Sequence, residues 1–279
     1  MTNALTIEHT TFALMGPLLH TKTRAMPCHC LIFRIGDRII LLDTGFGTRE
    51  MSQPNLLLGD DALFKLGIVV DPRLTAYERL KSRGILPEQV TDIILTHLDS
   101  DHAGGLYDFP NATVHLSAVE LKSFDSTRFR GPYKPYQLSH QTKFKTYEST
   151  GETWFGLEAW SLDLPEILDA KLVPLPGHTL GHCGVAYREN GKWSLHAGDA
   201  YFDSRVHFME PTPSLPLEIA FQSDAVARFT SLQKLQMLRQ KHSSEVSMYC
   251  THDQHEFQDW TRGRDVPDLI SEQILAASL

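Results

Sequence analysis

The chain has 279 residues, of which 42% are hydrophobic and 22% are charged, and its formal net charge is −8 at pH 7. This composition is typical of a globular protein that can bury a sizeable core, and it includes no run of about 18 apolar residues that could span a membrane. The negative charge excludes a protein that binds nucleic acid mainly through a basic surface.

The N-terminus and the cysteines favour a cytoplasmic location. Residues 1–9 have neither the basic start nor the apolar core of a signal peptide. Widely spaced cysteines in a chain of this length are expected to be reduced core residues rather than disulfide partners. Cys28 and Cys30 resemble half of a zinc site, but no second cysteine pair completes it, so we expect both to pack in the core.

The first predicted elements, in chain order, are antiparallel strands. Residues 30–35 and 39–42 alternate around a glycine turn and predict a hairpin. The partly apolar stretch 51–72 is predicted to be an irregular loop. Residues 75–83 have helical composition, and Gly84 is the expected end of that helix because glycine readily adopts the left-handed conformation found there.

Later strands are predicted where short apolar or alternating runs occur. They cover residues 93–95, 111–116, 171–175, 183–187, 193–197 and 245–250. Ser117 and Glu120 form a Ser-x-x-Glu capping box, so a helix is expected to begin near Ser117. Another helix is expected over 223–240, with its apolar face on a core. That face comprises Val226, Phe229, Leu232, Leu235 and Leu238.

An aromatic-rich stretch at 124–165 shows only weak periodicity. A segment of that length without regular structure is usually functional or disordered, and its aromatic content argues against disorder. The sequence contains no recognisable linker, low-complexity tract or repeat. We therefore expect residues 1–279 to form one α/β domain with an insertion at about 124–165.

Four metal-competent side chains lie within six residues directly after the strand predicted at 93–95, namely His97, Asp99, Asp101 and His102. Three later loops also follow predicted strands and present one candidate each, namely His178, Asp199 and His252. Seven nitrogen and oxygen ligands are too many for one tetrahedral ion. They suit two divalent ions that share a bridging carboxylate.

In order and spacing, these motifs resemble the metallo-β-lactamase fold superfamily. The resemblance runs from Asp43-Thr44-Gly45 to His252 and rests on His-x-Asp-x-Asp-His-x-Gly-Gly, Pro-Gly-His-Thr-x-Gly-His and Gly-Asp. It implies a four-layer αβ/βα sandwich, in which two mixed β-sheets flanked by helices hold the metals at one edge. It also implies the ligands: His97, Asp99 and His178 for the first ion, Asp101, His102 and His252 for the second, and Asp199 as the bridge.

Asp99 departs from the family pattern, because most hydrolytic members have histidine at that position. The carboxylate adds one negative charge, which makes the metal centre formally neutral instead of positive. It also shifts the preference from zinc towards harder ions such as manganese or iron. We therefore expect two divalent ions, zinc before manganese or iron, with loose or mixed occupancy of the first site.

The resemblance implies a metal-dependent hydrolase in which a bridging hydroxide attacks a carbonyl. Asp101 is expected to help move the proton. Tyr201 is expected either to donate a hydrogen bond to the carbonyl oxygen or leaving group, or simply to pack. Asp43 is expected to brace the site through hydrogen bonds without binding metal. His182 is expected either to support a ligand or to pack, and His196 to be a core residue.

The substrate wall is expected to come from the loop 51–72 and the insertion 124–165. Candidate substrate residues are Arg128, Phe129, Tyr133, Tyr136 and Trp154. Apolar rings over a nearly neutral centre favour a neutral ester or lactone with a hydrophobic tail, and the resemblance is strongest to the lactonase-like, quorum-quenching branch. Alternatively, the rings pack the insertion onto the sheet, or form a homodimer contact if they face outward as a patch.

Other functions of the same fold stay open at this point. A hydrolase of glutathione thioesters would need a basic docking surface, and a phosphodiesterase would need a phosphate-binding appendage or a basic face. A weakly active or non-catalytic metal-binding module is a further alternative because of Asp99. The expected partner is a small-molecule substrate, with neither nucleic acid nor a membrane.

Overall fold

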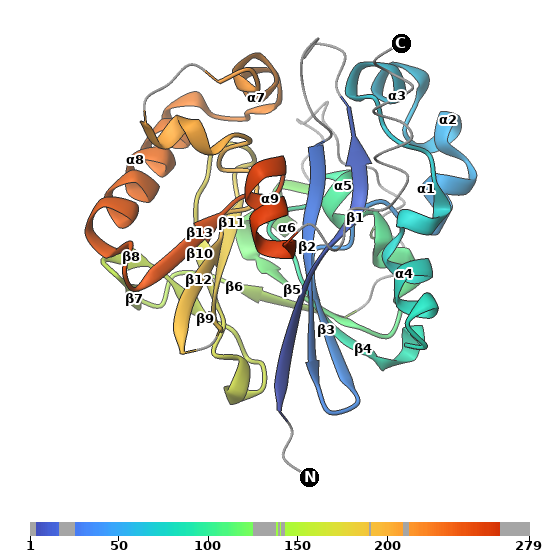
Figure 1. Cartoon of the computed structure of the whole chain (residues 1–279), viewed down its shortest axis with the longest axis horizontal. Coiled ribbons are helices and arrows are strands. Elements are labelled where there is room, and N and C mark those ends of the chain that lie inside the picture. The colour runs from blue at the N-terminus through green and yellow to red at the C-terminus, as the bar shows by residue number, and fades with distance from the viewer. Residues whose placement is uncertain are drawn as a thin grey trace.

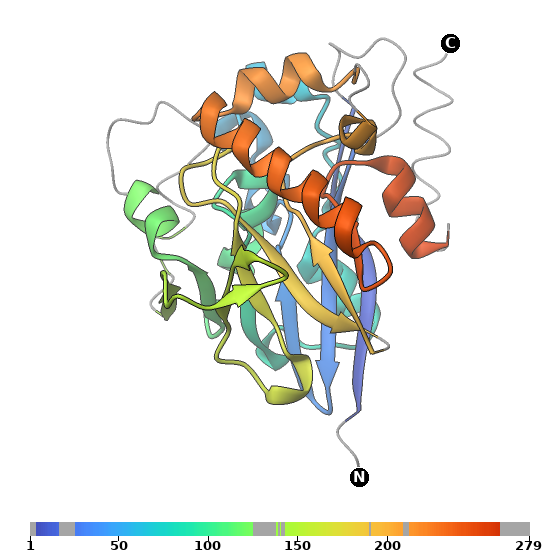
Figure 2. The ribbon, with the colours of Figure 1, turned by 90° about the vertical axis from the view of Figure 1, so that its left-hand side faces the viewer.

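The computed structural model describes residues 4–16, 26–124, 138, 140, 143–189, 191–208 and 212–262. Two β-sheets pack face to face, and helices cover their outer faces (Figure 1). In the view turned by 90°, helix α8 (Ala225–His242) crosses the outer face of the second sheet (Figure 2). This arrangement is the predicted sandwich of two mixed sheets flanked by helices.

The first sheet has the strand order β1-β2-β3-β4-β5-β6. Strands β1 to β3 are antiparallel and β3 to β6 are parallel, so the sheet is mixed. The predicted hairpin corresponds to β2 and β3. The bounds are β1 (Leu5–Met15), β2 (Met26–Ile35), β3 (Arg38–Leu42), β4 (Val90–Ile94), β5 (Thr113–Ser117) and β6 (Phe144–Tyr147).

The second sheet has the order β13-β12-β11-β10-β9, with β12 and β13 parallel and the other pairs antiparallel. Its bounds are β9 (Trp160–Ser161), β10 (Lys171–Pro174), β11 (Cys183–Glu189), β12 (Lys192–His196) and β13 (Val246–Tyr249), and a separate ribbon pairs β7 (Thr153–Trp154) with β8 (Leu157–Glu158). Strands β6 and β9 both lie within 124–165. The described part of the predicted insertion therefore supplies an edge strand to each sheet.

The stretch 51–72, predicted to be an irregular loop, is largely helical. The α-helices other than α8 are α1 (Thr48–Ser52), α2 (Pro54–Leu57), α3 (Asp60–Leu66), α4 (Ala76–Ser82), α5 (Ser100–Ala103), α6 (Ala118–Phe124), α7 (Leu215–Phe221) and α9 (Gln254–Thr261). Helices of four to seven residues, such as α1 to α3, are too short to show a helical period in the sequence. In the described part of the chain, no helix has the length and apolarity needed to cross a membrane.

Three apolar layers hold the elements together. One lies between the sheets and includes Phe33 and Val185. Another lies on the opposite face of the first sheet and includes Cys28 and Cys30, and the third lies between the second sheet and α8. All four cysteines are buried and free of disulfides, as expected.

The apolar face of α8 is only partly buried, which corrects the sequence-based expectation. Leu232, Leu235 and Leu238 are at most 8% exposed, but Val226 and Phe229 are 78% and 60% exposed. The first turns of α8 pack on the loop after β10 through other residues. The hydroxyl of Ser231 donates to the backbone oxygen of Pro176, and a Cβ on Gly177 would collide with the backbone of Arg228.

Candidate metal centre

The seven predicted ligand side chains lie in loops and a short helix that follow four strands. His97, Asp99, Asp101 and His102 follow β4, His178 follows β10, Asp199 follows β12 and His252 follows β13. Six of these residues are at most 5% exposed, whereas the side chain of Asp101 is 18% exposed. Each strand is fixed by the sheet, so the loops deliver their side chains to one place.

The first group consists of His97, Asp99 and His178. The Oδ2 atom of Asp99 lies 3.0 Å from Nε2 of His178 and 3.5 Å from Nε2 of His97. One ligand atom from each of the three residues lies within 4.8 Å of the other two. Two imidazoles and one carboxylate at these distances could hold a divalent ion.

The second group consists of Asp101, His102 and His252. The Oδ2 atom of Asp101 lies 3.5 Å from Nε2 of His102 and also 3.5 Å from Nε2 of His252. This group repeats the composition of the first, with two imidazoles and one carboxylate. It could therefore hold a second divalent ion.

Asp199 lies between the two groups. Its Oδ1 atom is 3.3 Å from Nε2 of His102, and its Oδ2 atom is 3.2 Å from Nε2 of His252. The same Oδ2 atom is 3.5 Å from Nε2 of His178 and 4.0 Å from Nε2 of His97 in the first group. One carboxylate in contact with both groups is the arrangement that a bridging ligand requires.

Several inward-facing atoms of this cluster are buried and, among the described residues, have no hydrogen-bond partner. They are Nε2 of His97, Nε2 of His102, Oδ1 of Asp99 and Oδ1 of Asp199. Leaving such an atom unpaired in the interior is unfavourable by about 1–3 kcal/mol. Four of them in one cluster of imidazoles and carboxylates fit a site whose partners are cations such as zinc, manganese or iron.

Hydrogen bonds on the far side of the rings orient the histidines. Nδ1 of His102 donates to Oδ2 of Asp43 at 2.8 Å, and Nδ1 of His252 donates to the backbone oxygen of Pro27 at 2.8 Å. With the proton on Nδ1, each Nε2 atom keeps its lone pair for a cation. Both rings therefore present the nitrogen that faces the ligand cluster.

The cluster is electrostatically suited to positive ions. Burial alone would raise the pKa of Asp199, but His252 and His102 outweigh it and hold that pKa well below the usual range. Burial would likewise raise the pKa of Asp99, but His97 and its neighbours hold that pKa below the usual range as well. Both carboxylates are therefore ionised at neutral pH and carry the negative charge that a cation would balance.

Asp43 braces the cluster, in agreement with the expectation from sequence. Its carboxylate accepts hydrogen bonds from the backbone nitrogen of Thr96 at 2.9 Å and from the hydroxyl of Thr96 at 2.8 Å, besides the one from His102. That hydroxyl lies 3.0 Å from Nδ1 of His97. One buried carboxylate thus orients a histidine from each group.

Replacing Asp43 with asparagine is expected to weaken metal binding by about 10- to 100-fold while leaving the fold intact. Asparagine tolerates the left-handed backbone at this position, where φ is +56°. However, its single carbonyl oxygen cannot accept hydrogen bonds from all three donors that meet the carboxylate.

Competition with a chromophoric chelator measures the change in metal affinity. Asp37→Asn, at the exposed β2–β3 turn, is the control, and unchanged metal affinity in Asp43→Asn would refute the bracing role.

His182 supports Asp199, which is one of the two roles expected for it, and does not join the cluster as a ligand. Its Nδ1 atom donates to the backbone oxygen of Leu175 at 2.8 Å, and its Nε2 atom accepts from the backbone nitrogen of Asp199 at 2.9 Å. Burial lowers the pKa of His182 well below its usual value, so the ring is neutral, as this pair of bonds requires. The ring fixes the backbone of the bridging residue.

Glu120 is a supporting residue that sequence reasoning missed. Its buried carboxylate accepts hydrogen bonds from the backbone nitrogen of Leu98 at 3.0 Å, the hydroxyl of Thr179 at 2.7 Å and the backbone nitrogen of Gly181 at 3.0 Å. It thereby ties the loop after β4 to the loop that carries His178. The capping-box pattern offered no sign of this role, because the partners are 22 to 61 residues away.

The structure gives Tyr201 and Trp154 surroundings unlike those of a substrate site. Tyr201 is fully buried, and its hydroxyl lies 3.2 Å from Oε2 of Glu256, which corresponds to the packing alternative. Trp154 is 4% exposed and packs against Trp193 in the apolar layer that includes α8. The other predicted substrate residues, Arg128, Phe129, Tyr133 and Tyr136, lie outside the described residues.

The raised pKa of Glu256, the partner of Tyr201, predicts how the stability of the protein depends on pH. Burial, reinforced by Asp253, raises the pKa of Glu256 from about 4.5 to about 8. The folded protein therefore holds a proton there that the unfolded chain has lost, so stability falls as pH rises between these two values. Glu256→Gln cannot ionise and is expected to gain stability relative to the original by a few kcal/mol between pH 5 and pH 8, at about 1.4 kcal/mol per pKa unit.

Urea unfolding at several pH values measures the free energy of unfolding of Glu256→Gln and of the original protein. In the difference between the two, the contributions of all other titrating groups cancel. Glu245→Gln, at an exposed position that pairs with His242, is the control. Parallel pH profiles for Glu256→Gln and the original protein would show that Glu256 is ionised in the folded state.

Comparisons with known proteins agree with this geometry. The family described as the metallo-beta-lactamase superfamily matches residues 23–248. A probable metallo-hydrolase of Mycobacterium tuberculosis is 32% identical over 246 residues, covering 82% of this chain and 75% of that protein. An N-acyl homoserine lactonase of Bacillus cereus is 27% identical over 161 residues, covering 56% of each chain.

A solved structure shows the same fold. It is an N-acyl homoserine lactone hydrolase with the product N-hexanoyl-L-homoserine bound at its catalytic metal centre. Its TM-score to this chain is 0.67 at 19% identity, over 93% of this chain and 96% of that one. The family match, the metallo-hydrolase relative and the converging ligand groups lead to one conclusion: the chain belongs to the metallo-β-lactamase superfamily and is a metal-dependent hydrolase.

Proposed function

We propose that the protein is a hydrolase with two divalent metal ions that acts on the carbonyl of a neutral ester or lactone with an apolar tail. The observation that carries this proposal is the position of Asp199, whose carboxylate contacts histidines of both ligand groups. His97, Asp99 and His178 would hold the first ion. Asp101, His102 and His252 would hold the second.

When bound, the two ions would lower the pKa of a water molecule and polarise the substrate carbonyl. The protein's own residues fix the geometry and move the proton. Asp101 is suited to that transfer, because its side chain is 18% exposed while Asp99 and Asp199 are at most 7% exposed. A carboxylate at the open side of the cluster can pass a proton to the leaving group.

Apolar side chains beside the cluster support an apolar substrate tail. The ring of Phe202 packs on His178 and His252, with centroids 5.8 and 4.9 Å apart. Leu180, two residues after His178, is 39% exposed, and Phe221, at the end of α7, is 37% exposed. The backbone nitrogen of Ser223 donates to the backbone oxygen of His178 at 2.9 Å, which ties the end of α7 to this loop. These apolar side chains favour an apolar substrate tail. The carboxylate of Asp99 makes the two-metal centre formally neutral, which favours a neutral substrate.

A substrate screen tests the proposal. Purified protein loaded with zinc, manganese or iron would be assayed with lactones, esters, thioesters and phosphodiesters of graded chain length. We expect turnover of lactones or esters that improves with a longer apolar tail, and Tyr201→Phe is the control that should retain it. Exclusive turnover of phosphodiesters would overturn the substrate class, and inactivity with every metal would favour a non-catalytic metal-binding module.

A further inference from the structure

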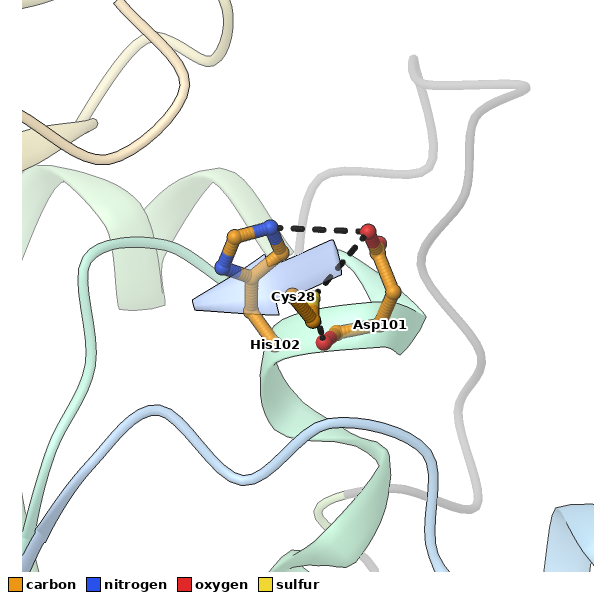
Figure 3. A group of neighbouring side chains, drawn as sticks. All are labelled: Cys28, Asp101 and His102. Atoms are coloured by element: carbon orange, nitrogen blue, oxygen red, sulfur yellow. Dashed lines mark hydrogen bonds and ion pairs between the residues drawn. The ribbon is translucent and has the colours of Figure 1, made fainter. Parts of the chain in front are cut away.

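A cysteine lies beside the second ligand group. The Sγ atom of Cys28, on β2, is 2.8 Å from the backbone oxygen of Asp101 and 3.7 Å from its Oδ2 atom. Figure 3 shows the thiol beside Asp101, with dashed lines to the backbone oxygen and the carboxylate of that residue. Sγ, a carboxylate oxygen of Asp101 and a ring nitrogen of His102 all lie within 4.8 Å of one another.

The backbone on both sides of Cys28 is bonded to the loop that carries His252. The oxygen of Pro27 accepts from Nδ1 of His252 at 2.8 Å, and the nitrogen of His29 donates to the oxygen of Thr251 at 3.1 Å. The thiol meanwhile reaches the residues of α5. The fold therefore fixes Cys28 between the two segments that supply the second ligand group.

The distances from Oδ2 of Asp101 to its neighbouring donors fit a tetrahedral ion. Metal–ligand bonds of about 2.0–2.3 Å place tetrahedral donors roughly 3.3–3.8 Å apart. Oδ2 of Asp101 lies 3.5 Å from Nε2 of His102, 3.5 Å from Nε2 of His252 and 3.7 Å from Sγ of Cys28. Nε2 of His102 is buried and lacks a hydrogen-bond partner within the described residues, which independently marks the same place.

We propose, building on the two-metal centre proposed above, that Cys28 is a ligand of the second metal ion. When the ion binds, the thiol proton passes to solvent and a metal–sulfur bond forms. A sulfur ligand favours a thiophilic ion such as zinc at this site, whereas the extra carboxylate of Asp99 favours manganese or iron at the first site. The two sites then differ in chemistry, and the protein takes up a mixed pair of metals.

Cadmium exchanged into the full-length protein tests this assignment, because a cadmium–thiolate bond gives an ultraviolet charge-transfer absorption. We expect that absorption to saturate at one thiolate per chain and to disappear in Cys28→Ser. Cys30→Ser is the matched control, since Cys30 is also buried on the same face of β2, and it should keep the absorption. Cys28→Ser should also bind one of the two cadmium ions at least about 10-fold more weakly.

The inference is overturned if the original protein binds cadmium without this absorption, or if Cys28→Ser keeps it. If Cys28→Ser does not fold, X-ray absorption spectroscopy of the cadmium-loaded original protein decides. A sulfur neighbour of the cadmium supports the assignment, and a shell of nitrogen and oxygen alone overturns it.

The role of Cys28 and the proposed function can fail separately. Hydrolysis with two bound ions but no sulfur neighbour would refute only the role of Cys28. Cadmium–thiolate absorption without hydrolysis of any substrate would refute only the proposed function, and no cadmium binding would refute both.

Discussion

Replacing Asp199 with asparagine is expected to lower kcat/KM by more than about 100-fold, the upper end of the loss when a residue that only supports a metal ligand is removed. The carboxylate contacts the cluster-facing Nε2 atoms of histidines in both ligand groups. Asparagine keeps the size of the side chain and the bond from its backbone nitrogen to His182, but it loses the charge and turns an amide donor towards the cluster. Activity and metal content per chain measure the effect.

Asp203→Asn is the matched control for this change. Asp203 lies four residues further along the chain, and its carboxylate pairs with Arg205 rather than with the ligand groups. We expect the control to retain both metal ions and near-original activity. If Asp199→Asn kept two ions and its activity, Asp199 could not be the bridge.

Replacing Asp99 with histidine is expected to raise zinc retention at the first site by at least about 10-fold, the free-energy equivalent of about 1.4 kcal/mol. The imidazole is a softer ligand than the carboxylate and removes one negative charge, so zinc should gain over manganese and iron. Chelator competition and the metal dependence of kcat/KM measure the change. We also expect activity towards anionic substrates to rise, because the centre gains one positive charge.

Asp99→Asn separates the two causes, because it removes the charge without supplying an imidazole. It should resemble Asp99→His in its tolerance of anionic substrates but not in zinc retention. If the original protein already held two zinc ions through mild chelation, the expectation of loose occupancy at the first site would be wrong.

The fold and the ligand residues could be predicted because their signals are local. Each predicted ligand directly follows a strand that a short apolar run announces, and His97 to His102 form a dense group of metal-competent types. The sheets then place ligands that are far apart in sequence next to one another. The short helices over 51–72 were missed, because four to seven residues show no period.

Some residues that act through distant contacts and belong to no recognised motif could not be predicted. Glu120 bonds to loops on both sides of the cluster, and the thiol of Cys28 contacts Asp101, 73 residues away. The position of Tyr201 next to the Asp199 loop left a catalytic and a packing role equally open, and only the fold shows that its hydroxyl lies 3.2 Å from Oε2 of Glu256. Such contacts depend on how loops pack, and the sequence around each residue does not encode that packing in a readable pattern.

Metal stoichiometry is the most direct test of the two-metal centre. The protein would be dialysed against excess zinc and manganese, freed of unbound metal and analysed by mass spectrometry for both metals per chain, beside the variants His97→Ala and His252→Ala. We expect two ions per chain in the original protein and one in each variant, because each variant loses a ligand of a different group. One ion or fewer in the original protein, or loss of the same ion in both variants, would contradict the account.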